Sequence, residues 1–425
     1  MSFALGVVPV VLLVLGFPIF LVLLTAVSVA LVFYMNIPLA ALHQNLFGSV
    51  NAYALLAIPY FIYAGELMGR GSVAQRLVDF VQSGVGPLRG SLGITTVGTA
   101  TIFGAISGVS AAAVATIGKV MYPPMVKQGY PKPFAAGLIT AVGAIDIIIP
   151  PSIPMIVYGA AAQESVPRLY AAGIIPGILI AAMIAGYVMW RARGGKFGAG
   201  EPFDSKRFLH ATTRSLWALG APVIILGGIY GGVFSPTEAA AVACVYAIVV
   251  TRFIFRELSW RDIVEAAAAT TRFTAQILIV VACAGVFSWL LTVNQVPAAL
   301  VNWLQAIGVG QLSFLLAVNV LLLLVGCFVD PLSAILLLTP LMIPVVKALG
   351  IDTVHFGIVV MVNLAIGLFT PPFGINIFVA QSVLGIDLKT IYRGILPFVV
   401  LYLIALLLIT YIPSLSLAGV WLLLN

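Results

Sequence analysis

The sequence contains very few charged residues. Asp, Glu, Lys and Arg make up only 8% of its 425 residues, while 62% are hydrophobic; a soluble domain is usually about 25% charged. This composition excludes a water-soluble fold of this size. It predicts an all-α polytopic membrane protein, because a helix satisfies its own backbone hydrogen bonds in the bilayer and an apolar run of about 20 residues spans it.

Residues that usually carry chemistry are also scarce. The three cysteines lie in apolar runs without metal-ligand spacing and are expected to be packing residues, and no histidine has a companion at such spacing. The sequence has no GxxxxGK(S/T) phosphate-binding loop, so ATP is not expected to drive its activity directly. The net charge of +7 comes mainly from basic residues beside apolar runs, which indicates membrane topology rather than nucleic-acid binding.

The distribution of basic residues predicts which segments face the cytoplasm. None precedes Arg70, so the N-terminus lacks the basic flank of a cleavable signal peptide, and its first apolar run is expected to stay in the membrane. Basic clusters at 191–214 and 251–272 flank two apolar runs, so the positive-inside rule places both clusters in the cytoplasm. The same trace puts both termini outside, provided that residues 3–36 form two short spans.

Two long apolar runs are interrupted near their middle by adjacent prolines. Pro150-Pro151 and Pro371-Pro372 interrupt runs that otherwise read as membrane helices, and a proline in a helix interior costs roughly 3 kcal/mol. A helix broken in mid-membrane exposes carbonyl oxygens and helix ends, which can bind ions where water is scarce. We therefore predict two broken transmembrane helices, although a proline kink used only for packing is the alternative.

The two breaks belong to an internal repeat. Pro371 follows Pro150 by 221 positions, and the same shift aligns Met121 with Met342 and Gly129 with Gly350. The charge trace gives the halves opposite orientations, and inverted repeats are typical of secondary transporters. The predicted organisation has two repeats, each with a re-entrant hairpin and a broken helix, joined by a cytoplasmic linker: a first repeat at 1–190 (hairpin about 91–125, broken helix about 133–161), a linker at 191–214 and a second repeat at 215–425 (hairpin about 312–345, broken helix about 351–384).

Polar residues near the predicted hairpin tips and breaks are the candidate site residues. The first tip carries Ser107, Gly108 and Ser110, which can expose carbonyls and hydroxyls or simply allow close helix packing. Asp330 precedes a proline in the second hairpin, where it binds a cation or only caps a helix. Asp146, deep in a span, can bind a cation or a proton, or pair with a lysine.

Several motifs carry a resemblance to one family. "SGVSAAAVA", "IIPPSIPMIVYGAA", "GGVFSPTEAAAVA", "DPLSAILLLTPLMIP" and "TPPFGINIFV" closely resemble the large membrane subunit of tripartite ATP-independent periplasmic (TRAP) transporters. The resemblance covers essentially the whole chain. It implies an inverted-repeat, elevator-type secondary transporter in the bacterial inner membrane with periplasmic termini, driven by sodium and importing an organic acid. It also implies two partners, a small four-helix membrane subunit and a periplasmic substrate-binding protein.

The resemblance also suggests where ions and cargo bind. It implies two sodium sites, one between the first hairpin tip and the first break (Ser107, Gly108, Ser110, Ile149 and Pro150), the other between the second hairpin and the second break (Asp330, Thr370, Pro371 and Gly374). Serine and asparagine donors at the tips and breaks are expected to hold the cargo: Ser107, Ser110, Ser152, Asn363 and Asn376. Asp146 departs from the small or apolar residue expected there.

Other functions stay open at this stage. The nearest alternative is a stand-alone sodium/dicarboxylate-type anion transporter that needs no binding protein. An intramembrane enzyme would need a catalytic pair, for which Asp146 with Asp330 is the only conceivable choice. A passive channel or an assembly scaffold could not accumulate solute against its gradient.

Overall fold

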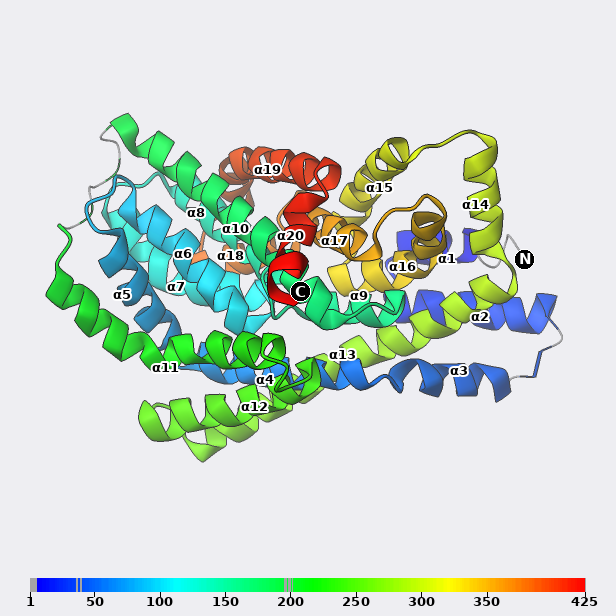
Figure 1. Cartoon of the computed structure of the whole chain (residues 1–425), viewed down its shortest axis with the longest axis horizontal. Coiled ribbons are helices and arrows are strands. Elements are labelled where there is room, and N and C mark those ends of the chain that lie inside the picture. The colour runs from blue at the N-terminus through cyan, green and yellow to red at the C-terminus, as the bar shows by residue number, and fades with distance from the viewer. Residues whose placement is uncertain are drawn as a thin grey trace.

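The computed structural model of the protein describes residues 6–35, 37–38, 40–194, 197, 200 and 202–424. The described residues form helices joined by short turns (Figure 1). Six of these helices are long and apolar enough to cross a membrane, and a bent pair at Ala40–Val50 and Tyr53–Arg70 makes a seventh if it is one span. Two helices are interrupted at adjacent prolines, as the proline pattern predicts, one between Ile147 and Ile153 and the other between Leu368 and Ile375.

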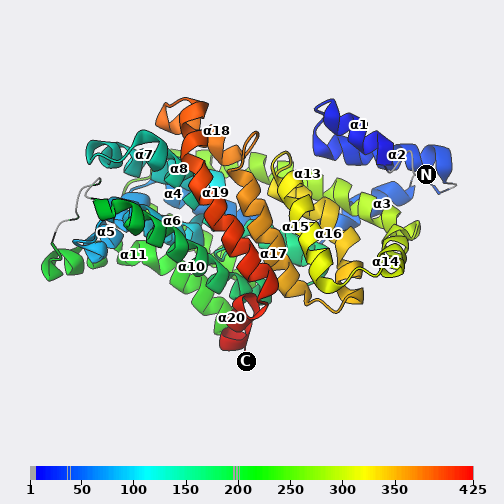
Figure 2. The same ribbon diagram turned by 90° about the horizontal axis from the view of Figure 1, so that it is seen from above.

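The first three helices, which end at residue 50, lie at one end of the molecule (Figures 1 and 2). The first apolar run is split near Pro18, as predicted, because Gly16 adopts a left-handed φ of +79° that ends the first helix. The second pair bends by 59°. The elements are α1 (Val8–Val14), α2 (Ile19–Tyr34), α3 (Ala40–Val50), η2 (Tyr53–Leu56), α4 (Ala57–Arg70) and α5 (Val73–Val85).

A helical hairpin and an interrupted helix follow. Gly108, with φ of +61°, ends one arm of the hairpin, and the second arm starts at Ser110. The next helix stops before Pro150-Pro151 and resumes at Ile153. The elements are α6 (Ser91–Ser107), α7 (Ser110–Lys127), α8 (Lys132–Val142), η3 (Gly143–Ile147), α9 (Ile153–Ala162), α10 (Val166–Arg191) and η4 (Ala192–Gly194).

The middle of the chain supplies long helices that begin at well-formed caps. Ser235 with Glu238, and Ser259 with Asp262, form capping boxes in which each side chain accepts a hydrogen bond from the other residue's backbone N–H. These boxes fix where two helices start. The elements are α11 (Ser205–Tyr230), α12 (Pro236–Ile248), the π-helical η5 (Val249–Ile254) and α13 (Trp260–Val293).

The C-terminal part repeats the order of hairpin, interrupted helix and long helix. Asp330 and Asp352 accept hydrogen bonds from backbone N–H groups at the starts of two helices. The chain breaks again at Pro371-Pro372. The elements are α14 (Val296–Ala306), α15 (Gln311–Gly326), α16 (Pro331–Ala348), α17 (Thr353–Leu368), α18 (Ile375–Leu384), α19 (Leu388–Tyr411) and α20 (Ser414–Leu424).

The two halves of the chain interlock through reciprocal contacts. The half-helix α9 packs on α16 of the second hairpin, and α18 packs on α7 of the first. In the same way α8 packs on α19, and α10 on α17. The α8–α19 crossing is very close, because a Cβ atom added to Gly137 would stand 2.2 Å from the Gly394 carbonyl oxygen. The long helix α13 packs against α2, α3, α4 and α16.

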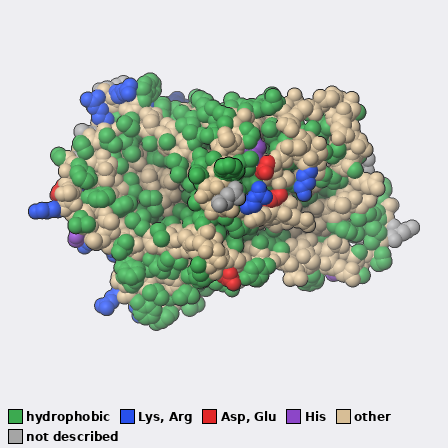
Figure 3. Space-filling model, in the orientation of Figure 1, with side chains coloured by type: hydrophobic (Ala, Val, Ile, Leu, Met, Phe, Trp, Pro, Cys, Tyr) green, Lys and Arg blue, Asp and Glu red, His purple; other side chains and the backbone are tan. Residues whose placement is uncertain are grey.

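The space-filling view of one face shows broad hydrophobic areas with charged side chains gathered in a few places (Figure 3). Exposed large apolar side chains occur on several of the long helices, including α11 and α13. Contiguous apolar surface of this extent is typical of a protein surrounded by lipid or partner helices. The surface is therefore consistent with the multi-span character of the fold.

Candidate transport site

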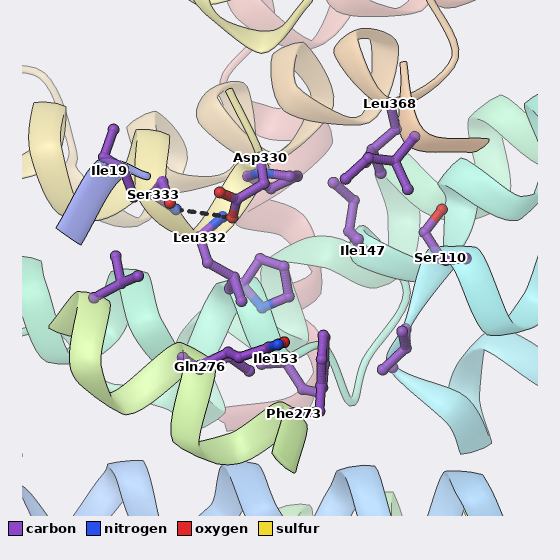
Figure 4. A pocket seen from close by; sticks show the side chains of 18 of the residues that line it. Ile19, Ser110, Ile147, Ile153, Phe273, Gln276, Asp330, Leu332, Ser333 and Leu368 are labelled. Atoms are coloured by element: carbon purple, nitrogen blue, oxygen red, sulfur yellow. Dashed lines mark hydrogen bonds between the residues drawn. The ribbon is translucent and has the colours of Figure 1, made fainter. Parts of the chain in front are cut away.

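A cavity of about 470 Å³ lies where both hairpin tips, both helix breaks and α13 meet. Figure 4 shows Ser110 on one side of it, Asp330 and Ser333 on another, and Gln276 with Phe273 facing them from α13. The remaining lining is mostly apolar and comes from these same elements and from the start of α2: Pro18, Ile19, Phe20, Gly108, Val109, Ala111, Ile147, Ile153, Pro154, Ile277, Ile279, Val280, Pro331, Leu332, Leu368 and Ile375.

Four helices begin at this cavity. Its lining includes Ser110, Ile153, Pro331 and Ile375, which are the first residues of α7, α9, α16 and α18. The N-terminus of a helix carries a partial positive charge and several unpaired N–H groups. An anion in the cavity would thus meet the positive ends of α7, α9 and α18 although no lysine or arginine lines it. At the start of α16 the Asp330 carboxylate already accepts from two of the N–H groups.

The first hairpin tip touches the first break. A Cβ atom added to Gly108 would stand 3.2 Å from the Pro151 carbonyl oxygen. Ser107 uses its hydroxyl locally, since Ser107 Oγ accepts from the Val109 N–H at 3.3 Å. Ile149 and Pro150 are buried within the same break and do not line the cavity. The predicted first sodium site therefore consists of segments that are in contact.

Ser110 links this tip to the second half of the chain. Its hydroxyl donates to the Gly143 carbonyl at 2.7 Å and accepts from Asn376 Nδ2 at 2.9 Å. Asn376, at the start of α18, also donates to the Thr140 carbonyl at 3.3 Å. Both side chains are buried, with 5% and 0% of their surface exposed. Asn376 does not line the cavity and holds α18 against the first hairpin.

The second hairpin tip lies beside the second break. Asp330 Oδ1 accepts hydrogen bonds of 3.1 Å from the N–H groups of Leu332 and Ser333, and the residue lines the cavity. The rings of Phe328 and Phe373, from the tip and the break, are 5.6 Å apart between centroids. Asp330 is the only ionisable residue among the described residues that line the cavity.

Other predicted site residues do not line the cavity. The Ser152 hydroxyl donates to the Ile147 carbonyl at 2.7 Å, and the Thr370 hydroxyl donates to the Ile366 carbonyl at 2.6 Å. Asn363 donates to Asn319 Oδ1 at 2.8 Å inside the bundle. These three residues, together with Ser107, Pro371 and Gly374, do not line the cavity.

The cavity also contains polar residues that the sequence analysis did not select. Gln276 and Ser333 line it, and Phe273 lies beside Gln276 (Figure 4). The available signal for Gln276 is a neutral polar residue inside the long apolar run that follows Arg272. Its position means that α13 supplies one wall of the site.

A multi-span helical fold with a mostly apolar cavity at the meeting point of interrupted helices defines a membrane transporter rather than an enzyme. The chain belongs to the DctM component family of the tripartite ATP-independent periplasmic transporters, whose family model matches residues 7–415. The family resemblance predicted from the motifs is thereby confirmed. The chain is a multi-pass permease component of a bacterial TRAP system, a family whose transport is independent of ATP.

Known proteins named as TRAP transporter permeases are similar in sequence to this chain over most of its length. It is 39% identical to the C4-dicarboxylate TRAP transporter large permease protein DctM of Pseudomonas aeruginosa, over 88% of each chain, and 38% identical to the ectoine TRAP transporter large permease protein TeaC of Halomonas elongata, over 96% of each. It is 39% identical over 95% of its length to the isethionate TRAP transporter permease protein DctMQ of Oleidesulfovibrio alaskensis, and spans 64% of that protein.

A solved structure supports the fold. The YdaH transporter of Alcanivorax borkumensis superposes with a TM-score of 0.65 at 18% sequence identity, covering 90% of this chain and 88% of that one. The likeness shows that the chain has an all-helical, multi-span fold resembling that structure.

Proposed function

We propose that the protein is the transport subunit of a sodium-coupled importer of an organic acid. It works in the bacterial inner membrane, with both termini on the periplasmic side, beside a small four-helix membrane subunit and a periplasmic substrate-binding protein. The observation that carries this proposal is the convergence of four helix N-termini on one cavity. They offer an anion several N–H donors without the tight grip of an arginine.

The helix breaks supply oxygen ligands for sodium. Each hairpin tip lies against a break whose backbone leaves helical geometry, and Asp330 adds a carboxylate beside the second. Oxygen donors with few carboxylates suit a hard monovalent cation better than calcium. We place one ion between Ser107–Ser110 and the first break, and the other between Asp330 and the Thr370–Gly374 break.

We further propose an elevator movement of two inverted repeats. The reciprocal packing of α9 on α16 and α18 on α7 supports a mobile body made from both hairpins and both half-helices. The long helix α13, with its neighbours α3 and α4, forms the fixed wall. In this arrangement the cargo rests between the mobile body and Gln276 of the fixed helix.

The names of the relatives suggest the cargo class. Large permeases similar to this chain are named for C4-dicarboxylates, ectoine and sialic acid, which all carry a carboxylate. We infer that this chain also moves a small organic acid. Two sodium ions entering with a monoanion carry one net charge inward, and each charge moved down 100 mV releases about 2.3 kcal/mol.

Reconstitution tests the proposal. The chain and its small membrane subunit are placed in proteoliposomes with the periplasmic binding protein outside, and uptake of the radiolabelled acid is followed under an inward sodium gradient. We expect accumulation in sodium buffer and none in potassium-only buffer. Uptake by the permease without the binding protein would instead favour a stand-alone sodium/dicarboxylate-type transporter. Equal uptake in both buffers would overturn sodium coupling.

A further inference from the structure

Asp146 is a carboxylate that the described residues leave without a partner. It lies in η3, immediately before the first break, and none of its surface is exposed. Neither carboxylate oxygen makes a hydrogen bond, and no described lysine or arginine pairs with it. The lysine partner that the sequence left open is therefore absent from the described part of the chain.

The carboxylate occupies a space that Gly104 provides. A Cβ atom added to Gly104 would stand 2.9 Å from Asp146 Oδ1 and 3.1 Å from its Cα. Gly104 lies on α6, one turn before the tip of the first hairpin. The polar groups around the carboxylate are the Ser107 hydroxyl and the backbone amides of Gly108 and Val109, all outside hydrogen-bond geometry. Asp146 is thus directly behind the tip.

The second half of the chain has a glycine, not a carboxylate, at the position equivalent to Asp146. A shift of 221 residues places Asp146 on Gly367 and Val109 on Asp330. Gly367 packs so closely that an added Cβ atom would stand 2.4 Å from the Gly326 carbonyl oxygen, which leaves no room for a carboxylate. The position of the carboxylate therefore differs between the two halves. Asp330 lies at the tip of the second hairpin, whereas Asp146 lies behind the tip of the first.

A fully buried ionised carboxylate without a partner costs several kcal/mol. A cation bound between the carboxylate and the hairpin tip would remove that cost, because it would pair with the carboxylate where the dielectric constant is low. The Ser107 hydroxyl, which lies near the carboxylate, is a further oxygen ligand of the kind that a hard cation takes.

We propose that Asp146 is a direct ligand of the sodium ion bound behind the first hairpin tip, together with the Ser107 hydroxyl. This inference rests on the proposed sodium coupling and adds a specific anionic ligand to it. Each hairpin then holds its ion with one carboxylate, Asp146 for the first and Asp330 for the second. The two ion charges are balanced inside the protein before the cargo binds.

The experiment measures sodium binding through stability. The permease with its small membrane subunit is purified in detergent, and its thermal unfolding midpoint is recorded against sodium concentration, with potassium keeping the ionic strength constant. Ligand binding stabilises the folded state by RT ln(1 + [L]/Kd), so the midpoint rises once the sodium concentration exceeds the sodium Kd. We expect Asp146→Asn to shift the onset of this rise to sodium concentrations about tenfold higher or more. In potassium alone the variant should be as stable as the natural protein, because a buried charge has been removed.

Two further variants separate a ligand from a structural residue. Asp79→Asn removes a carboxylate from the exposed surface of α5 and should leave the sodium response unchanged. Asp146→Ser, which keeps an oxygen in place of the carboxylate, should weaken sodium binding in the same direction as Asp146→Asn. A loss of stability in potassium equal to that in sodium would assign Asp146 a packing role and overturn the inference.

The outcomes also distinguish this inference from the proposed function. If the natural protein responds to sodium and Asp146→Asn responds at the same concentrations, sodium coupling stands and Asp146 is not a ligand. If the natural protein shows no sodium response and its uptake ignores sodium, both proposals are wrong.

Discussion

Asp330 has one observed role, the cap of α16, and one proposed role, as a sodium ligand. Its Oδ1 accepts two backbone hydrogen bonds of 3.1 Å at the start of the helix, and the same residue lines the cavity. Asp330→Asn keeps a capping oxygen and deletes the charge, whereas Asp330→Ala deletes both. Comparing the two variants therefore separates the contribution of Asp330 to helix capping from its proposed contribution to sodium binding.

The expected magnitudes differ for the two roles. Replacing an N-cap Asp by Ala costs about 1 kcal/mol, while Asn caps about as well as Asp. In potassium buffer Asp330→Ala should thus lose about 1 kcal/mol of stability, and Asp330→Asn should stay close to the natural protein. Both variants lose the anionic ligand, so the sodium concentration for half-maximal uptake should rise about tenfold or more, which corresponds to about 1.4 kcal/mol.

Two assays read these effects independently. Thermal unfolding in potassium reports the cap, and uptake into proteoliposomes against sodium concentration reports the ligand. The reasoning is refuted if Asp330→Asn takes up the acid with natural sodium dependence while Asp330→Ala loses only stability. In that case Asp330 is a helix cap and the second ion is held by backbone oxygens alone.

Three other predictions follow from contacts described above or from the loop between η5 and α13. Gly137→Ala should destabilise the protein by several kcal/mol, because its Cβ would stand 2.2 Å from a backbone oxygen of α19; detergent thermal unfolding checks this, with Gly186→Ala, which meets no atom within 4 Å, as the control. Burial alone would raise the pKa of Glu257, but hydrogen bonds from Ser72 and a nearby arginine outweigh it and hold the pKa below 4.5. Its stabilisation is therefore present above about pH 4.5 and lost as the pH falls through the lowered pKa, so Glu257→Gln should flatten the fall of the thermal midpoint below that pH, and an unchanged fall would contradict it. Gln276→Ala should raise the KM for uptake severalfold without changing the sodium dependence, since Gln276 lines the cavity from α13; transport kinetics at saturating sodium measure both quantities.

The helix breaks and hairpin turns could be predicted from sequence because their causes are local. Proline has no N–H and clashes with the preceding helical turn, which predicts the interruptions at Pro150 and Pro371. Residue type alone is not sufficient, because the adjacent prolines Pro123 and Pro124 lie inside the continuous helix α7. Gly108 at the first tip takes a left-handed conformation that glycine adopts without strain. The family could be predicted for a similar reason, since its motifs surround these same turns.

The composition of the cavity wall could not be predicted in this way, because it depends on how helices rotate against one another. Asn363 was expected to hold cargo, yet its side chain faces α15 and donates to Asn319. Ser110 and Asn376 are 266 positions apart and meet only because α18 packs on α7. Gln276 gave no periodic signal, since one glutamine in an apolar span says nothing about which face meets the cavity.

The crossed packing of α9 on α16 and α18 on α7 would couple each proposed ion position to the opposite half of the chain. A tip that shifts when its ion leaves must disturb the half-helix leaning on it, and through that half-helix the other break. Occupancy of the two positions is therefore expected to be cooperative, with the empty and fully loaded forms favoured over mixtures. A half-loaded mobile body could carry sodium inward without cargo and so dissipate the ion gradient. Because the crossed packing disfavours that half-loaded form, such a carrier is expected to leak few ions.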